Sequence, residues 1–153
     1  MELSDQEIAL LQEIQADASL SLAEIATRVG MAQSTVWRKL QEFEATGLIR
    51  GRVALLDPAK VGAKLCVLAS VSLQDHSEPS VRGFTDLVRR LPEILECHKV
   101  SGEADYMLKV RVTDVEAYED FMSHNLLRSP FVRAVVSSFV LKEIKATTAL
   151  PVA

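Results

Sequence analysis

The residues best suited to binding another molecule lie in one short stretch, where polar and basic side chains share one face of a predicted helix. Residues 33–39 read QSTVWRK, and the apolar residues Val36, Leu40 and Phe43 recur at helical spacing, so they fall on one face of a helix. The opposite face offers hydroxyl, amide and cationic groups, which hydrogen-bond to base edges and phosphates. We predict that this face binds double-stranded DNA; a helical hairpin with a solvated polar face is the alternative. The candidate DNA-binding residues here are Gln33, Ser34, Thr35, Arg38 and Lys39.

A preceding helix must hold this helix in place. Ser21, followed three residues later by Glu24, has the spacing of a capping box, and apolar residues recur at helical spacing over residues 22–29. Gly30 stands where a left-handed turn is needed, a conformation that a side chain would oppose. An amphipathic helix over residues 5–17 would pack behind both. The pattern predicts a helix-turn-helix within a three-helix unit.

The predicted helix that begins at residue 33, which we call the reading helix, is followed by a short segment rich in β-forming residues. Residues 48–56, LIRGRVALL, carry Arg50 and Arg52 on either side of a glycine. We expect a wing or a linking strand whose arginines follow the phosphate backbone; an edge strand with surface charges is the alternative. An Asp-Pro pair at 57–58 then breaks the pattern. The expected divisions are a DNA-binding domain over 1–50, a linking strand and hinge over 51–63, and an effector-binding and oligomerisation domain over 64–153.

The second half predicts the order strand, helix, strand, strand, helix, strand. The expected ranges are 64–74, 80–91, 94–101, 106–112, 115–127 and 131–145. This is the order of a ferredoxin-like βαββαβ domain, with two helices on one face of an antiparallel sheet. The expected fold class is therefore α+β, an N-terminal winged helix-turn-helix plus a C-terminal ferredoxin-like domain. We also expect an apolar second sheet face that dimerisation would bury, made of Val67, Val71, Val110, Val112, Val136 and Val140.

The net charge of −4 is unusual for a protein that binds DNA. However, most of the basic residues among the first 60 lie between Arg28 and Arg52, where only Glu42 and Glu44 oppose them. Attraction to phosphates depends on local clustering more than on the total charge. A weakly basic patch of this kind favours a binder that gains avidity by forming a homodimer or a larger assembly.

Composition favours a folded cytoplasmic protein. Hydrophobic residues make up 48% of the chain, but the apolar runs at 65–71 and 132–141 are too short and interrupted to span a bilayer. The N-terminus lacks the basic region of a signal peptide, so no membrane partner is expected. Cys66 and Cys97 lie far apart, which favours buried thiols over a disulfide or a metal site.

From about Leu3 to Leu150 the chain resembles the Lrp/AsnC (feast/famine) family of prokaryotic transcription regulators. The resemblance rests on the helix-turn-helix and on three motifs: EATGLIRGRVALLDPAKVG, ILECHKVSGEADYMLKVRV and SSFVLKEIK. It implies a winged helix-turn-helix before a ligand-sensing domain, dimerisation through the sheets, and assembly of dimers into an octamer. It also implies a small amino acid as effector, such as leucine, methionine or alanine.

The same resemblance places the effector site on the loop SGEADY. Gly102 would let backbone N–H groups approach an α-carboxylate, and Asp105 could balance an α-ammonium group. A simple hairpin turn in which Asp105 bonds its own loop is the alternative. The implied effector-binding residues are Gly102, Glu103, Ala104, Asp105 and Tyr106, with Ser138, Phe139 and Val140 on the last strand.

The reading helix departs from the family pattern at several positions. Ala32 stands where the family usually has a capping serine, Gln33 where proline is common, and Lys39 where arginine is usual. Because the cap is lost, we expect that the start of the helix could move to Ser34. Trp37 flanks the apolar stripe, and we expect it to be partly buried rather than to stack on DNA sugars.

Few residues could catalyse a reaction. The histidines at 76, 98 and 124 are not spaced as a metal-binding pair, and Cys97 and His98 would point to opposite faces of a strand. We therefore expect no enzyme, no catalytic residue, no metal and no cofactor. The chain also resembles the siroheme decarboxylases, enzymes with the same two-domain architecture that have lost the DNA-binding role. They are the enzymatic alternative. A second alternative is an assembly factor that reaches DNA through a partner.

Overall fold

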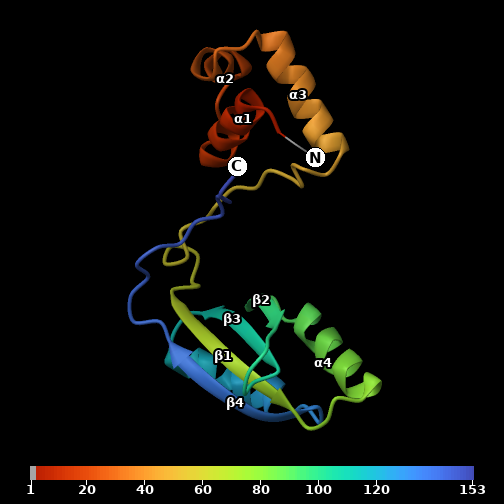
Figure 1. The fold of residues 1–153 in the computed structure, drawn as a ribbon. Coiled ribbons are helices and arrows are strands. Elements are labelled where there is room, and N and C mark those ends of the chain that lie inside the picture. Colours follow the sequence, from red (N-terminus) through yellow and green to blue (C-terminus); the bar gives the residue numbers. More distant parts are fainter. Residues whose placement is uncertain (1–2) are drawn as a thin grey trace. The chain divides into compact units, whose positions relative to one another are not determined.

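The computed structural model describes residues 3–153, which form two compact units (Figure 1). The N-terminal unit comprises the chain up to Leu55 together with the C-terminal tail, Ile144–Ala153. The C-terminal unit is Leu56–Glu143. This division differs from the expected domain of 64–153, because the tail belongs to the first unit.

Three helices form the N-terminal unit: α1 (Asp5–Ala16), α2 (Leu22–Val29) and α3 (Gln33–Ala45). The capping box of Ser21 and Glu24 is present, and a second box joins Ser4 to Glu7 at the start of α1. Gly30 adopts φ +65°, the left-handed turn that joins α2 to α3. The predicted helix-turn-helix is therefore confirmed, and its first two helices begin at hydrogen-bonded caps.

The C-terminal tail completes the core of the N-terminal unit. The side-chain amide of Gln15 donates to the Leu150 carbonyl at 2.7 Å, and the Leu150 N–H donates back to the Gln15 amide oxygen at 2.9 Å. Val152 packs against the same apolar cluster as Leu3. The chain end marked C in Figure 1 accordingly lies beside α1. The tail thus contributes packing and hydrogen bonds to a unit whose helices come from the other end of the chain.

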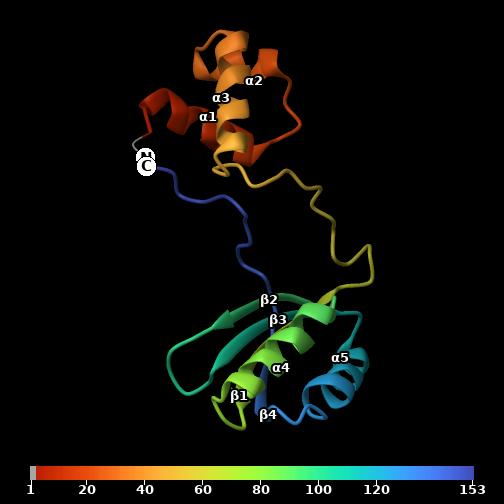
Figure 2. The same ribbon diagram turned by 90° about the vertical axis from the view of Figure 1, so that its right-hand side faces the viewer.

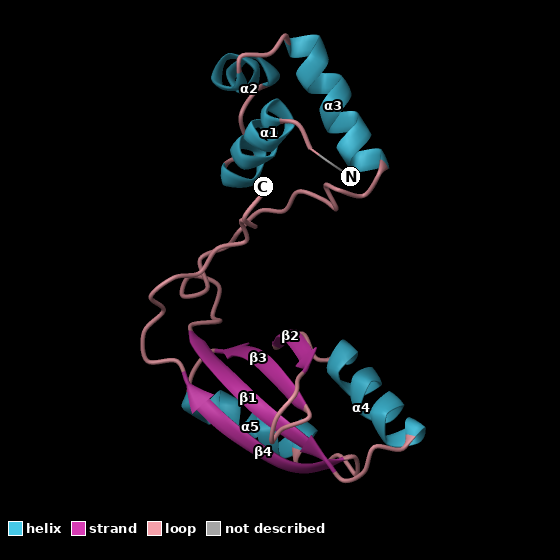
Figure 3. Cartoon of the chain, in the orientation of Figure 1, coloured by secondary structure: helices cyan, strands magenta, loops and turns pink. Residues whose placement is uncertain are grey.

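The expected strand at 48–56 is not formed: within residues 3–153, no strand lies between Ala45 and Leu65 (Figure 3). A strand needs a neighbour that accepts and donates its ladder hydrogen bonds, and the N-terminal unit supplies none to this segment. The linker instead ends in a turn, where the Ala63 N–H donates to the Pro58 carbonyl at 2.8 Å and Gly62 has φ +74°.

The C-terminal unit has the predicted βαββαβ order. Its elements are β1 (Leu65–Leu73), α4 (Glu78–Arg90), β2 (Ile94–Lys99), β3 (Tyr106–Val112), α5 (Val115–Phe121) and β4 (Val132–Phe139). The sheet is antiparallel with the order β2-β3-β1-β4, and Figure 2 shows α4 and α5 on one of its faces. The expected helix over 115–127 is α5 followed by a π-helical turn, Met122–Leu126. The ferredoxin-like topology is confirmed.

The last strand is shorter than the expected 131–145. Phe139 is paired with Val67, near the start of β1, and the Val140 N–H donates to the Cys66 carbonyl at 3.0 Å. The pairing of β4 with β1 ends here, and the chain continues towards the tail.

The expected apolar second face was largely wrong. Four of its six valines are buried and face the helices: Val67, Val71, Val110 and Val112. The other face carries Val136, which is 66% exposed, together with Leu68, Ser70 and Lys109. That face is therefore mixed in character rather than uniformly apolar. No helix among residues 3–153 has the length and hydropathy needed to cross a membrane.

Candidate DNA-binding face and effector loop

One face of α3 is exposed along its length. The opposite side of the helix buries the predicted stripe of Val36, Leu40 and Phe43, which fixes the orientation of the whole helix. Thr35 is half-buried at the edge of the exposed face. The exposed residues between positions 33 and 41, which we call the reading face, are Gln33, Ser34, Trp37, Arg38 and Gln41.

The first turn of α3 has backbone N–H groups that could donate hydrogen bonds to a ligand. The helix begins at Gln33, so the expected shift of its start to Ser34 was wrong. Ala32 is the capping residue, and no side chain in the described part of the chain caps the first turn. Because the first N–H groups of a helix lack partners within it, an uncapped start can donate to a phosphate oxygen.

The four predicted basic contacts fall into two classes. Arg38 and Arg50 are exposed and take part in no ion pair among residues 3–153. By contrast, Arg52 pairs with Glu44 at 2.8 Å, on the exposed surface. Lys39 is held by two carboxylates and its side chain is only 22% exposed. Arg38 and Arg50 are therefore free to meet phosphates, whereas Lys39 is engaged within the unit.

Lys39 braces α3 against α1. Its ammonium lies 2.8 Å from Glu7 Oε1 and 3.1 Å from Glu42 Oε2. The hydrogen bond from Lys39, with those from Ser4, lowers the pKa of Glu7 from its usual 4.5 to about 2. Glu7 in turn raises the pKa of Lys39. The structure therefore pairs Lys39 with carboxylates of α1 and α3, and its DNA contact stays a prediction.

This ion pair predicts acid sensitivity of the N-terminal unit. A carboxyl whose pKa is lower in the folded state stabilises the fold above its unfolded pKa, and that contribution is lost as the pH falls from about 4.5 to about 2. Since Glu7 is 16% exposed, we expect about 1–2 kcal/mol after discounting for solvent screening. Denaturant unfolding of the wild type and Glu7→Gln, at pH 7 and pH 3, measures this difference.

Glu7→Gln should therefore be less stable than the wild type at pH 7, and the difference in stability should be smaller at pH 3. Glu44→Gln is the matched control, because Glu44 belongs to an exposed pair with Arg52. It should behave like the wild type at both values of pH. Equal effects of the two substitutions on the free energy of unfolding would show that the Glu7–Lys39 pair stabilises the fold no more than an exposed pair does.

Trp37 is partly covered, as expected, but it does not belong to the apolar cluster of α3. The residue is 56% exposed, and the described residues packed on that cluster do not include it. It lies one residue beyond Val36 on the helix, which turns its side chain out of the stripe and onto the reading face. Its spacing from Ser34 and Gln41, by three and four residues, was the available signal.

The predicted effector loop, residues 101–106, joins β2 to β3. Gly102 has φ +117°, a conformation that strains any residue with a Cβ, and nothing among residues 3–153 lies within 4 Å of where a Cβ would stand. Gly102 and Glu103 are exposed, and Ala104 is half-buried. The loop therefore presents an open backbone on which a ligand could rest.

Asp105 anchors this loop to the neighbouring strand. Its Oδ2 accepts the Leu73 N–H at 2.7 Å, and its backbone N–H donates to the Val71 carbonyl at 3.0 Å. Its Oδ1 lies 2.7 Å from His76 Nε2, on a side chain that is 70% exposed. The His76 hydrogen bond and the Leu73 N–H lower the pKa of the Asp105 carboxyl. His76 is thus a neighbour of the candidate site that sequence reasoning missed, since it comes from the loop after β1.

The remaining expected effector residues lie at the start of β3 and around the end of β4. The Tyr106 ring is buried in the core, where its centroid lies 4.8 Å from that of the Phe84 ring. Burial raises the pKa of Tyr106. Phe139 faces the helices, with its ring 5.5 Å from that of Tyr118. Ser138 lies on the opposite face of the sheet, and Val140 follows the end of β4.

The two halves of the expected site are not brought together within one chain. Tyr106 is paired with Val71, whereas Ser138 is paired with Leu68 on the far side of β1. Three residues along a strand span about 10 Å, and two strand spacings add about 10 Å across the sheet. A ligand touching both halves would therefore need a second copy of the chain.

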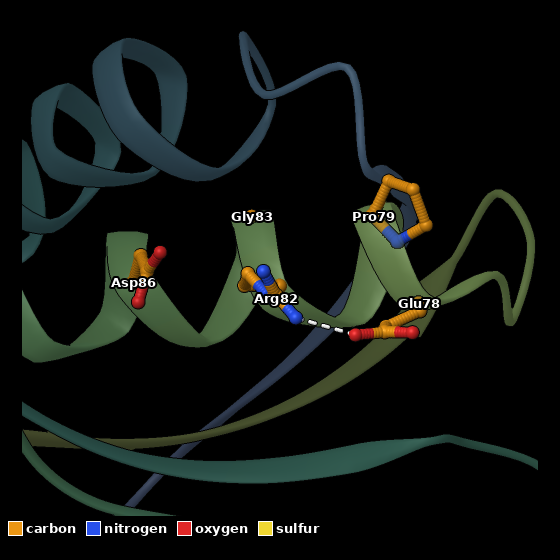
Figure 4. A pocket seen from close by; sticks show the side chains of 5 residues that line it. All are labelled: Glu78, Pro79, Arg82, Gly83 and Asp86. Carbon is orange, nitrogen blue, oxygen red and sulfur yellow. Dashed lines mark hydrogen bonds and ion pairs between the residues drawn. The ribbon is translucent and has the colours of Figure 1, made fainter.

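The described hollows are shallow and lie away from the loop. One has a volume of about 400 Å³ and is lined by Glu78, Pro79, Arg82, Gly83 and Asp86 of α4, with Arg82 paired to Glu78 (Figure 4). Next to it, a Cβ on Gly83 would lie 2.3 Å from the ring of Phe131, so only glycine permits this close approach. Residues 101–106 line none of the three pockets described in residues 3–153.

A helix-turn-helix with a free arginine on its reading face, followed by a ferredoxin-like domain, defines a DNA-binding transcription regulator. Residues 3–50 match the winged helix-turn-helix DNA-binding domain, and residues 66–150 match the Lrp/AsnC ligand binding domain. The chain therefore belongs to the Lrp/AsnC family of transcription regulators, as the resemblance predicted.

The relatives agree with this assignment. The chain is 36% identical over 143 residues to the DNA-binding transcriptional activator DecR of Escherichia coli K12, covering 94% of each chain. It is 36% identical over 141 residues to the leucine-responsive regulatory protein of the same strain, covering 92% of this chain and 86% of the relative. A transcriptional regulator from Neisseria meningitidis, solved as an L-methionine complex, superposes with a TM-score of 0.95 at 37% identity, covering 98% and 97%. These proteins are regulators, and none of these comparisons supports the siroheme-decarboxylase alternative.

Proposed function

We propose that this protein is an amino-acid-responsive transcription regulator that binds operator DNA through the reading face of α3. The observation that carries this proposal is the contrast between Arg38, which is exposed and unpaired among the described residues, and Lys39, which is paired inward. Arginine donates in a bidentate geometry to guanine or to phosphate. Gln33, Ser34 and Thr35 would contact bases or phosphates from the first turn, and Arg50 would contact the backbone beside it.

The effector would be a small amino acid bound at residues 101–106. Gly102 opens the backbone to a carboxylate, and the ammonium group of the ligand would take Oδ1 of Asp105 in place of the exposed His76. Two structural neighbours support a small amino acid of the leucine, methionine or alanine class. One is the L-methionine complex from Neisseria meningitidis, and the other is an M. tuberculosis feast or famine regulatory protein complexed with L-methionine, at 26% identity.

The working unit would be a homodimer that assembles further, to an octamer, in the cytoplasm. Exposed apolar residues favour a second copy: Val136 on the sheet, and Val53, Leu55 and Leu56 on the linker. The separation of Ser138 and Val140 from the effector loop supports a ligand site completed by another chain. A ligand that binds between copies favours one assembly, and that assembly sets the spacing of the reading faces.

Thermal stabilisation against a panel of amino acids, with siroheme included, tests this function. A ligand that binds only the folded state stabilises it by an amount that grows with the ratio of ligand concentration to Kd. A true effector should therefore raise the melting temperature as its concentration increases. Sizing with and without the ligand should then show a change in assembly. Stabilisation by siroheme alone would contradict the proposal.

A further inference from the structure

Trp37 is an exposed indole in the middle of a polar face. Its neighbours on the reading face are Gln33, Ser34, Arg38 and Gln41, and it is not part of the apolar cluster that α3 buries. Keeping more than half of an indole in water forgoes hydrophobic stabilisation, so the position is unfavourable for the isolated unit. A partner that covers the indole would restore that stabilisation.

The surroundings of Trp37 favour DNA over another protein as the partner. A protein interface usually has several apolar residues at its centre, whereas here one aromatic ring stands among amides, a hydroxyl and a guanidinium. The major groove has the matching pattern, because its base edges are polar donors and acceptors and its one apolar feature is the C5-methyl group of thymine.

The place of Trp37 on α3 fits base contact. In a helix-turn-helix the N-terminal half of the second helix enters the groove, and Trp37 is the fifth residue of α3, directly before Arg38. An indole is longer than the neighbouring serine and glutamine side chains, so it reaches at least as deep as they do.

We propose that Trp37 determines part of the operator sequence by packing its indole against the methyl group of a thymine in each half-site. The inference rests on the proposed DNA contact of the reading face and adds to it a base preference. It predicts that affinity depends on one thymine methyl per half-site.

Duplexes selected from a random pool by the wild-type protein provide the probe. Replacing each thymine in turn by deoxyuridine removes only the methyl group. The wild type should lose roughly fourfold in affinity at one position in each half-site. Trp37→Ala should bind the original duplex more weakly and be indifferent to the same replacement, whereas Trp37→Phe should retain part of the dependence.

Intrinsic fluorescence gives a second readout, because Trp37 is the only tryptophan in the chain. The selected duplex should change the emission, and an amino-acid effector alone should change it little. Gln41→Ala is the matched control, being exposed on the same face. It should keep the methyl dependence.

The outcomes separate this inference from the proposed function. If Arg38→Ala weakens binding but Trp37→Ala shows the same methyl dependence as the wild type, the thymine contact is overturned and the reading face stands. If neither substitution affects binding, the reading face itself is overturned. Unchanged fluorescence on saturating the protein with the duplex would also overturn the contact.

Discussion

Arg38→Ala is expected to weaken operator binding by about 5- to 150-fold for each half-site, because a bidentate arginine contact contributes about 1–3 kcal/mol. The thermal stability of the N-terminal unit should not change, since Arg38 is exposed and forms no ion pair in the described part of the chain. Titration of a selected duplex at several salt concentrations measures the effect. A phosphate contact would reduce the salt slope by about one, whereas a guanine contact would relax the preference at one position.

Lys39→Ala is the matched control for this substitution. It removes a neighbouring charge that is directed towards Glu7 and Glu42 rather than into solvent. It should lower the melting temperature and leave the salt slope nearly unchanged at temperatures where the protein is folded. A larger loss of affinity from Lys39→Ala than from Arg38→Ala would contradict our assignment of the two residues.

Asp105→Ala is expected to abolish stabilisation by the effector while basal DNA binding persists. The substitution removes the acceptor of the Leu73 N–H, which ties the loop to β1, and the carboxylate oxygen proposed to receive the ligand ammonium. A charge-assisted hydrogen bond contributes about 1.5–3 kcal/mol, so affinity should fall at least tenfold. Calorimetric titration with L-methionine, followed by DNA binding with and without the amino acid, measures both effects.

His76→Ala separates the two roles of Asp105. It leaves the bond to Leu73 intact and frees Oδ1, so effector binding should be retained or become tighter. If His76→Ala loses binding as fully as Asp105→Ala, the histidine itself contacts the ligand. If Asp105→Ala lowers DNA affinity and effector affinity equally, Asp105 serves the fold alone.

Most of the fold could be predicted from local patterns. The capping box at Ser21 and Glu24 marks the start of α2, and the bounds of β3 agree with the expected 106–112. The strand order followed from the sequence of elements, because the ferredoxin-like topology is the common arrangement for it. These features depend on residues close together in the chain.

The misplaced features depend on partners far away in the chain. Lys39 pairs with Glu7 in another helix, and Asp105 meets His76 from the loop after β1. The alternation of apolar residues in a strand could not show whether Val67 and Val71 face the helices or the other side of the sheet, since it is the same whichever face is covered. The lost strand at 48–56 fails for a related reason: its residues favour a strand, but no neighbour pairs with it.

The packing of the tail changes what counts as the DNA-binding module. Leu3 and Val152 contact the same cluster, so the ferredoxin-like domain is, in topology, an insertion between two parts of one unit. A fragment that stops at Leu55 would expose the surface on which Val152 packs, and it would remove the Leu150 backbone groups that bond to the Gln15 side chain. A circular permutant that begins at Ile144, runs through Ala153 and a short linker, and ends at Leu55 would rebuild the module as one continuous chain.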